Sequence, residues 1–213
     1  MKKRTLVAII VTIAIVIVDQ IIKIAVKTNF RLHETIEVFP WFRLSFVENE
    51  GMAYGMDFIG TLFLTVFRIV AIGLFIFLLV KCVKQQKPVG FIICLAMIIA
   101  GALGNVIDNC LYGLIFSEST PFEVSHFTSF DSGSGAFLEG KVVDMFYFPL
   151  FTWPESIPLV GGRVFFSAIF NFADAAITCG VIAMLLFYSR SLFSSDKNSD
   201  KSETKTEEKI ETN

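Results

Sequence analysis

The sequence predicts an α-helical protein that crosses a membrane several times, and two observations lead to this fold class. Hydrophobic residues make up 54% of the 213 positions, and the mean hydropathy is +0.66, well above that of an ordinary soluble domain. Four apolar runs are each long enough to cross about 30 Å of hydrocarbon as a helix. We therefore expect a polytopic membrane protein with four transmembrane helices.

The expected spans divide the chain into a membrane domain and a tail. They cover residues 5–26, 58–80, 89–106 and 164–188. Outer loops follow at residues 27–57 and 107–163, and residues 1–188 form one expected domain. Residues 189–213 are rich in Ser, Lys and Glu, a composition that predicts a disordered cytoplasmic tail.

The basic residues flanking the spans predict the orientation. Three precede the first span and three lie in the short link between the second and third spans: Lys2, Lys3, Arg4, Lys81, Lys84 and Lys87. By the positive-inside rule, both termini are cytoplasmic and both long loops are outside. The first apolar run is interrupted by Asp19-Gln20 and has no small-x-small cleavage site, so it predicts a retained span and not a signal peptide.

The outer loops predict a small β-rich element and a segment that lies on the membrane surface. Residues 35–39 and 42–48 alternate like two strands around a turn at Pro40-Trp41. In the second loop, residues 148–158 combine prolines with aromatic side chains, and Trp153 suits the headgroup layer.

Polar side chains within the spans are the candidate functional residues, since each is costly in hydrocarbon without a partner. Asp19 and Lys23 are four residues apart and share a helix face, so they can pair. That pair is either part of a site or a structural pair that snorkels to the interface. Arg68 needs a partner, for which Asp19 is one candidate. Asn105 and Asp108 share a face at the outer end of the third span, as a polar cap or as support for a site.

Two further carboxylates carry the main hypothesis. Asp144 follows a polar, aromatic-rich loop, and Asp174 lies inside the fourth apolar run. Two carboxylates brought together at a membrane edge can share one proton and activate a water molecule. We expect Asp174 to lie about ten residues into its span, on the order of 15 Å from the outer end of that span. The two carboxylates should then lie below the outer surface, in a groove between spans.

Several other chemistries lack their motifs. His33-Glu34 has no second histidine of a zinc-peptidase helix, and no serine nucleophile motif or phosphate loop is found. The four cysteines form no C-x-x-C pair, so neither a disulfide nor a metal is inferred. No basic, aromatic-interleaved surface indicates nucleic acid.

The pattern as a whole resembles the lipoprotein signal peptidases (signal peptidase II), which are membrane aspartyl proteases of bacteria. Five short blocks of that family can be matched in order: Asp19-Gln20 with Lys23, residues 49–54 (NEGMAY), residues 101–109 (GALGNVIDN), residues 142–145 (VVDM) and residues 170–174 (FNFAD). Each block alone is weak, but five in order on four spans are highly specific. Asn109 stands where the third block usually has arginine, and Met145 where the fourth has phenylalanine.

The resemblance implies an activity and the roles of the residues. Asp144 and Asp174 would be the catalytic dyad, with no metal and no cofactor. The supporting or substrate-binding residues would be Asp19, Lys23, Asn49, Gly51, Gly104, Asn105, Asp108 and Asn171. The implied substrate is a diacylglyceryl-modified prolipoprotein, cut before its lipidated cysteine. The implied setting is the bacterial cytoplasmic (inner) membrane, with membrane lipid as surroundings and the site toward the outer face. We expect the chain to be a monomer.

Other classes fit parts of the pattern. A transporter or proton relay also places acids in spans, but it predicts a polar path to the cytoplasmic side, and the inner halves of the third and fourth spans carry no charge. A metal-dependent membrane transferase usually needs more carboxylates within one or two helical turns. A scaffold would leave the intramembrane acids without a role.

Overall fold

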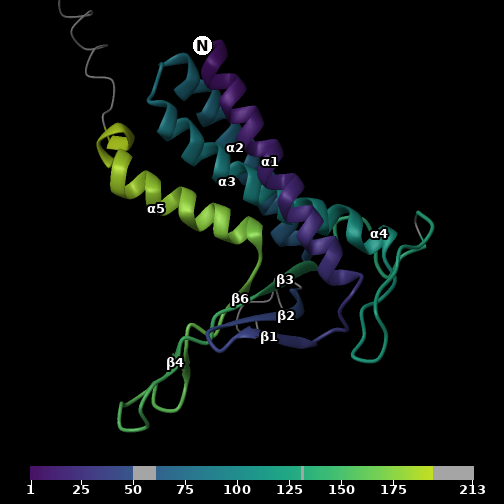
Figure 1. Ribbon diagram of the computed structural model, residues 1–213. Coiled ribbons are helices and arrows are strands. Elements are labelled where there is room, and N and C mark those ends of the chain that lie inside the picture. Colours follow the sequence, from purple (N-terminus) through teal and green to yellow (C-terminus); the bar gives the residue numbers. More distant parts are fainter. Residues whose placement is uncertain (50–60, 131, 194–213) are drawn as a thin grey trace, which may run out of the picture.

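Four long helices form the body of the protein in a computed structural model that describes residues 1–49, 61–130 and 132–193. The helices are α1 (Lys2–Lys27), α2 (Thr61–Lys84), α3 (Val89–Ile107) and α5 (Phe172–Phe193). Each contains a stretch long and apolar enough to cross a membrane, as the sequence predicts. Figure 1 shows the N-terminus and the α2–α3 link at one end of the bundle and a small sheet at the other.

Glycines bring α3 and α5 into close contact. A Cβ atom at Gly101 would meet the backbone oxygen of Ala173, and one at Gly180 would meet the backbone oxygen of Cys94. In a membrane, helices associate through packing because lipid tails are as apolar as the helix surface, so small residues set how near two helices come. Gly101, and Gly104 three residues later, thus let the start of α5 lie directly against the outer end of α3.

The outer end of α3 changes its winding but does not stop. It continues as the π-helix η1 (Asp108–Tyr112) and the short α4 (Gly113–Ile115), so the helical region runs eight residues beyond residue 107, where we expected the second loop to begin. A π-turn carries one extra residue per turn and rotates the following side chains, and such turns are frequent at functional sites. Here the rotation places Asp108 and Asn109 both in the interior.

A four-stranded antiparallel sheet closes this end of the bundle, in the order β1-β2-β3-β6. Its strands are β1 (Thr35–Phe39), β2 (Phe42–Asn49), β3 (Val142–Tyr147) and β6 (Ile169–Phe170). The two strands predicted in the first loop are confirmed. Between Leu44 and Val47, β2 contains one residue more than the facing part of β3, a β-bulge. Beyond the bulge, Val47 faces Asp144 and Asn49 faces Val142.

The fourth helix begins later than the expected span of residues 164–188. Residues 164–165 form β5, which pairs with β4 (Phe151–Thr152), and residues 169–170 form β6; α5 starts only at Phe172. Hydropathy cannot separate these short apolar strands from the helix that follows them. The β4–β5 hairpin extends away from the helices in Figure 1, and the predicted position of residues 148–158 on the membrane surface stays a prediction.

Candidate active site at the sheet end of the bundle

The first turn of α5 holds one of the two predicted catalytic carboxylates. The Asn171 side chain accepts a hydrogen bond from the Asp174 backbone N–H at 2.9 Å, and the Asp174 carboxylate accepts one from the Asn171 backbone N–H at 3.4 Å. This reciprocal arrangement is a capping box, which satisfies two N–H groups that a helix start leaves unpaired. Asp174 therefore lies at the start of its helix, and the expected position about ten residues into the span was wrong.

The second carboxylate, Asp144, lies in the centre of β3 and is only 3% exposed. Asn171 Nδ2 donates to its Oδ1 at 2.7 Å, and Asn49 Nδ2, from the end of β2, donates to its Oδ2 at 3.1 Å. Both oxygens of the carboxylate are thus held by uncharged amides from two different elements, which fix its orientation.

Two asparagines connect the carboxylates to each other. Asn105, on α3, donates from Nδ2 to Asp174 Oδ1 at 2.9 Å. Its own Oδ1 accepts a hydrogen bond from Asn171 Nδ2 at 3.1 Å, and Asn171 also contacts Asp144. A continuous chain of hydrogen bonds therefore runs from Asp144 through Asn171 and Asn105 to Asp174. Two carboxylates that lie far apart in the sequence meet in one polar site.

The buried lysine Lys23, on α1, contacts the side chains next to the two carboxylates. Lys23 Nζ lies 3.1 Å from Asp19 and 2.7 Å from Asp108, and it donates to Asn105 Oδ1 at 2.8 Å. All three charged side chains are fully buried. The predicted Asp19–Lys23 pair is confirmed, but it does not snorkel to an interface. Removing one partner of a buried ion pair leaves an uncompensated buried charge, so each of these three side chains depends on the other two.

The same triad also holds the neighbouring elements. Asp19 Oδ1 accepts a hydrogen bond from the Ala173 backbone N–H at 2.9 Å, at the start of α5, where the helix dipole favours an anion. Asp108 Oδ2 accepts one from the Val143 backbone N–H at 3.4 Å, next to Asp144. A Cβ atom at Gly104 would meet the Asp19 carboxylate, which explains why this position is a glycine. Of the supporting residues named from the sequence, Gly51 lies outside the described residues.

Two side chains of the site were missed at the sequence level. Gln20 Nε2 donates to Asp108 Oδ1 at 2.9 Å and to the Gly104 carbonyl at 3.2 Å, and Tyr112 donates its hydroxyl hydrogen to Gln20 Oε1 at 3.2 Å. Gln20 carried a signal, because an amide directly after an aspartate in an apolar run needs polar partners. Tyr112 carried none, because it comes into the site only through the π-turn of η1.

Burial and charge change the acid strength of Asp144. Removal from water is the larger cause and the nearby Asp174 carboxylate the second, and together they raise the pKa of the Asp144 carboxyl from 3.8 to about 7. The hydrogen bonds from Asn49 and Asn171 act in the opposite direction but do not offset this shift. At neutral pH the site can therefore hold one proton on Asp144. This is the protonation state that a two-carboxylate catalyst requires.

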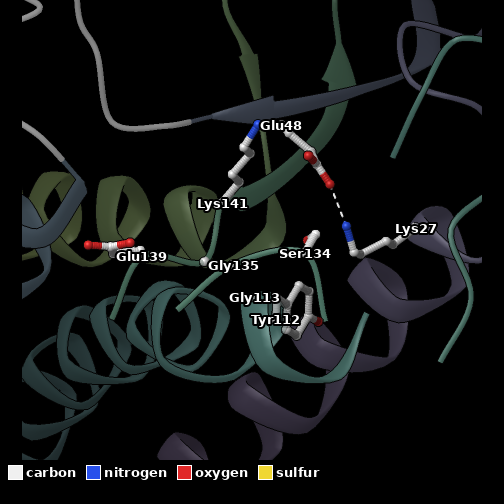
Figure 2. A pocket seen from close by; sticks show the side chains of 9 residues that line it. Lys27, Glu48, Tyr112, Gly113, Ser134, Gly135, Glu139 and Lys141 are labelled. Carbon is white, nitrogen blue, oxygen red and sulfur yellow. Dashed lines mark hydrogen bonds and ion pairs between the residues drawn. The ribbon is translucent and has the colours of Figure 1, made fainter. Parts of the chain in front are cut away.

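A small pocket beside the site is lined in part by Tyr112, Glu48 and Lys27 and contains neither predicted catalytic carboxylate. It has a volume of about 40 Å³, room for very few water molecules. Figure 2 shows Glu48 reaching from β2 toward Lys27 at the end of α1. This ion pair is nearly buried, and Ser119 hydrogen-bonds both partners. Glu48 directly precedes Asn49, so the pair anchors the strand end that contacts Asp144.

The intramembrane arginine also has its partner. Arg68 Nη1 donates to Asn109 Oδ1 at 2.8 Å, whereas Asp19, the candidate partner, is held by Lys23 and the start of α5. The sequence left two features unexplained: the charge of Arg68 in the second span, and Asn109 in place of an arginine. The two side chains are partners in one hydrogen bond.

Four helices of membrane length carry a polar site with two carboxylates at one end, and the family comparisons assign the chain to the membrane peptidases of the aspartyl class. The sequence profile described as Signal peptidase (SPase) II matches residues 11–190. A protein named Lipoprotein signal peptidase from Porphyromonas gingivalis is 46% identical over 185 residues, covering 84% of this chain and 81% of the relative. The chain belongs to the signal peptidase II family.

More distant matches share either the relatives' name or the fold. A Lipoprotein signal peptidase from Amoebophilus asiaticus is 29% identical over 181 residues, covering 80% of this chain and 72% of that protein. A solved structure described as a bacterial membrane enzyme superposes with a TM-score of 0.56 at 22% identity, covering 88% of this chain and 93% of the other. At that identity, the structural likeness supports the fold alone.

Proposed function

We propose that the chain removes the signal peptide from diacylglyceryl-modified prolipoproteins by cutting before the lipidated cysteine. The observation that carries this proposal is the hydrogen-bonded chain that joins Asp144 to Asp174 through Asn171 and Asn105. Such an arrangement suits a shared proton and an activated water molecule. The family membership and the relatives named Lipoprotein signal peptidase supply the substrate class.

In the proposed mechanism the two carboxylates have different roles. Asp174 is the charged base that takes a proton from the attacking water, and Asp144 is the protonated acid that polarises the scissile carbonyl and later protonates the leaving amine. The raised pKa of Asp144 supports this division. Activity should therefore fall as the pH rises through about 7, because Asp144 then loses the proton that it donates.

The proposed orientation places the site at the outer face and both termini in the cytoplasm. The basic residues Arg4, Lys81 and Lys84 lie at the end of the bundle opposite the sheet, as the positive-inside rule requires. At the outer boundary the diacylglyceryl chains of a substrate can stay in lipid while the peptide bond meets water. The proposed peptidase domain is residues 1–188.

The distribution of buried charge does not favour a transporter. Within the described part of the chain, the buried charged side chains lie toward the sheet end of the bundle: Asp19, Lys23, Lys27, Asp108 and Asp144. Toward the other end, the helices pack an apolar cluster that includes Ala8, Phe91 and Met184. A proton or ion path would need polar groups through that region as well.

Cleavage of a diacylglyceryl-modified prolipoprotein by the purified protein in detergent, with EDTA present, tests the proposal. Wild type and the matched surface variant Glu123→Gln should cleave, whereas Asp144→Asn and Asp174→Asn should each lose nearly all activity. The same precursor without its diacylglyceryl group should not be cut. A folded wild type that cleaves neither substrate, or aspartate variants that cleave normally, would overturn the proposal.

A further inference from the structure

Arg68 lies in the apolar helix α2 and is half-buried. A guanidinium in such a helix is costly unless it has a hydrogen-bonding partner or faces a water-filled cavity. Its hydrogen bond to Asn109, at 2.8 Å, joins α2 to the π-turn at the end of α3. Helix α2 is otherwise mostly apolar, and this hydrogen bond holds the Arg68 side chain in place.

Asn109 transmits this contact to the loop before β3. Asn109 is 1% exposed, and its Nδ2 donates to the Gly140 carbonyl at 2.6 Å. The Gly140 backbone N–H donates in return to the Asn109 carbonyl at 2.9 Å. A Cβ atom at Gly140 would meet the carbonyl oxygens of Asp108 and Asn109, so the two segments touch with no space between them.

A second contact from the same face of α2 reaches the same loop. Thr65, fully buried and three residues before Arg68, donates its hydroxyl hydrogen to the Leu138 carbonyl at 3.1 Å. Residues three apart lie side by side on a helix. Helix α2 thus holds the loop at Leu138 directly and at Gly140 through Asn109.

The loop leads directly to the dyad. Strand β3 begins at Val142, and Asp144 follows within it. Gly140 therefore lies four residues before Asp144, at the point where the strand leaves the helices. A shift of this point would move the carboxylate relative to Asp174, and displacements of about 1 Å can reduce catalysis by about a hundredfold.

We propose that Arg68 and Asn109 form a positioning pair that sets the location of Asp144. In this chain the guanidinium of Arg68 holds the Asn109 side chain, and that side chain holds the Gly140 carbonyl. The inference rests on the proposed function, because its readout is peptide cleavage. It assigns to Arg68 a role that its position in the second span did not indicate.

The test is an exchange of the two side chains, measured as kcat and KM with the lipidated precursor in detergent. Arg68→Met should lower kcat by about tenfold to a hundredfold with little change in KM, because substrate contacts are kept. Asn109→Arg alone should also lower kcat, because it places a second guanidinium beside Arg68. The double variant R68N/N109R should recover kcat to within about threefold of wild type, since the guanidinium introduced at position 109 can then hold Gly140 itself.

Arg4→Met is the matched control. Arg4 also donates to an amide oxygen, that of Gln86 at 2.6 Å, but it lies at the opposite end of the bundle, and its variant should keep full kcat. Wild-type kcat in Arg68→Met, or an exchange variant no better than the poorer single variant, would overturn the inference. If Arg68→Met does not fold, as judged by thermal unfolding, kcat of the exchange variant decides. An inactive wild type would instead count against the proposed function.

Discussion

Replacing Asp144 with asparagine should abolish activity, and it should stabilise the folded protein clearly at pH 8 but hardly at pH 5. The pKa of the buried carboxyl is about 7 in the folded protein against an ordinary value of 3.8. At pH 5, wild-type Asp144 carries a proton in the folded protein and resembles the neutral amide. At pH 8 it is ionised in a buried site, which the asparagine avoids.

The sign and size of the effect follow from the two pKa values. Between pH 3.8 and about 7, the folded state holds a proton that the unfolded state has lost, so the free energy of unfolding falls as the pH rises through this window. The full difference corresponds to about 4 kcal/mol at 1.36 kcal/mol per pH unit, and roughly 3 kcal/mol of it develops between pH 5 and pH 8. For a chain of this length, that part corresponds to roughly 6–12 °C in Tm.

Thermal unfolding of wild type and Asp144→Asn in detergent, at pH 5 and pH 8, measures the effect. The asparagine also loses one acceptor for Asn49 or Asn171, which costs about 1 kcal/mol at both pH values. The informative quantity is therefore the change in the Tm difference between the two pH values. If the Tm difference between Asp144→Asn and wild type is the same at pH 5 and pH 8, the reasoning is refuted. For the control variant Glu123→Gln, the Tm difference from wild type should be the same at both pH values.

Three further predictions concern the support of the site. Lys23→Met leaves two buried carboxylates without their cation and should lower stability by about 3–5 kcal/mol, seen as a loss of Tm that a second change, Asp108→Asn, partly restores. Gly101→Val pushes α5 away from α3 and should cost about 1–3 kcal/mol together with most activity. Gly73→Val, where a Cβ has open space, should keep both stability and activity. Equal losses of stability and activity in the two valine variants would exclude the packing argument. Glu48→Gln, which weakens the ion pair with Lys27, should lower kcat more than it raises KM; an unchanged kcat would mean that the strand end holds Asn49 without it.

The parts of the fold that follow from local pattern could be predicted. The alternation in residues 35–49 indicated the first two strands, and the second of them is the more buried. The start of α5 was misplaced because residues 164–170 are as apolar as the helix. A better signal was present: Asn171 and Asp174 have the spacing of a capping box, which indicates a helix beginning at Phe172.

The site was predictable where its residues share a helix or a recognised block. Asp19 and Lys23 pair because they are four apart, and the structure adds the third charge, Asp108, from another helical segment. The partner of Arg68 could not be derived, because the π-turn of η1 determines which way Asn109 faces. A contact that depends on an irregular helical turn does not follow from the regular spacing of residues in the sequence.

The bulge in β2 has a consequence for the charge of the site. Residues directly opposite in an antiparallel pair share a face, so Val47 opposite Asp144 puts Asn49 on the face of the dyad and Glu48 on the other. If β2 kept its length but paired with β3 without the bulge, Phe46 would face Asp144 and that order would reverse. Glu48 would then stand beside Asp144 as a third carboxylate. The electrostatic balance of the site therefore depends on a backbone irregularity, and a change that straightened the bulge without altering any ionisable residue would act like a charge mutation.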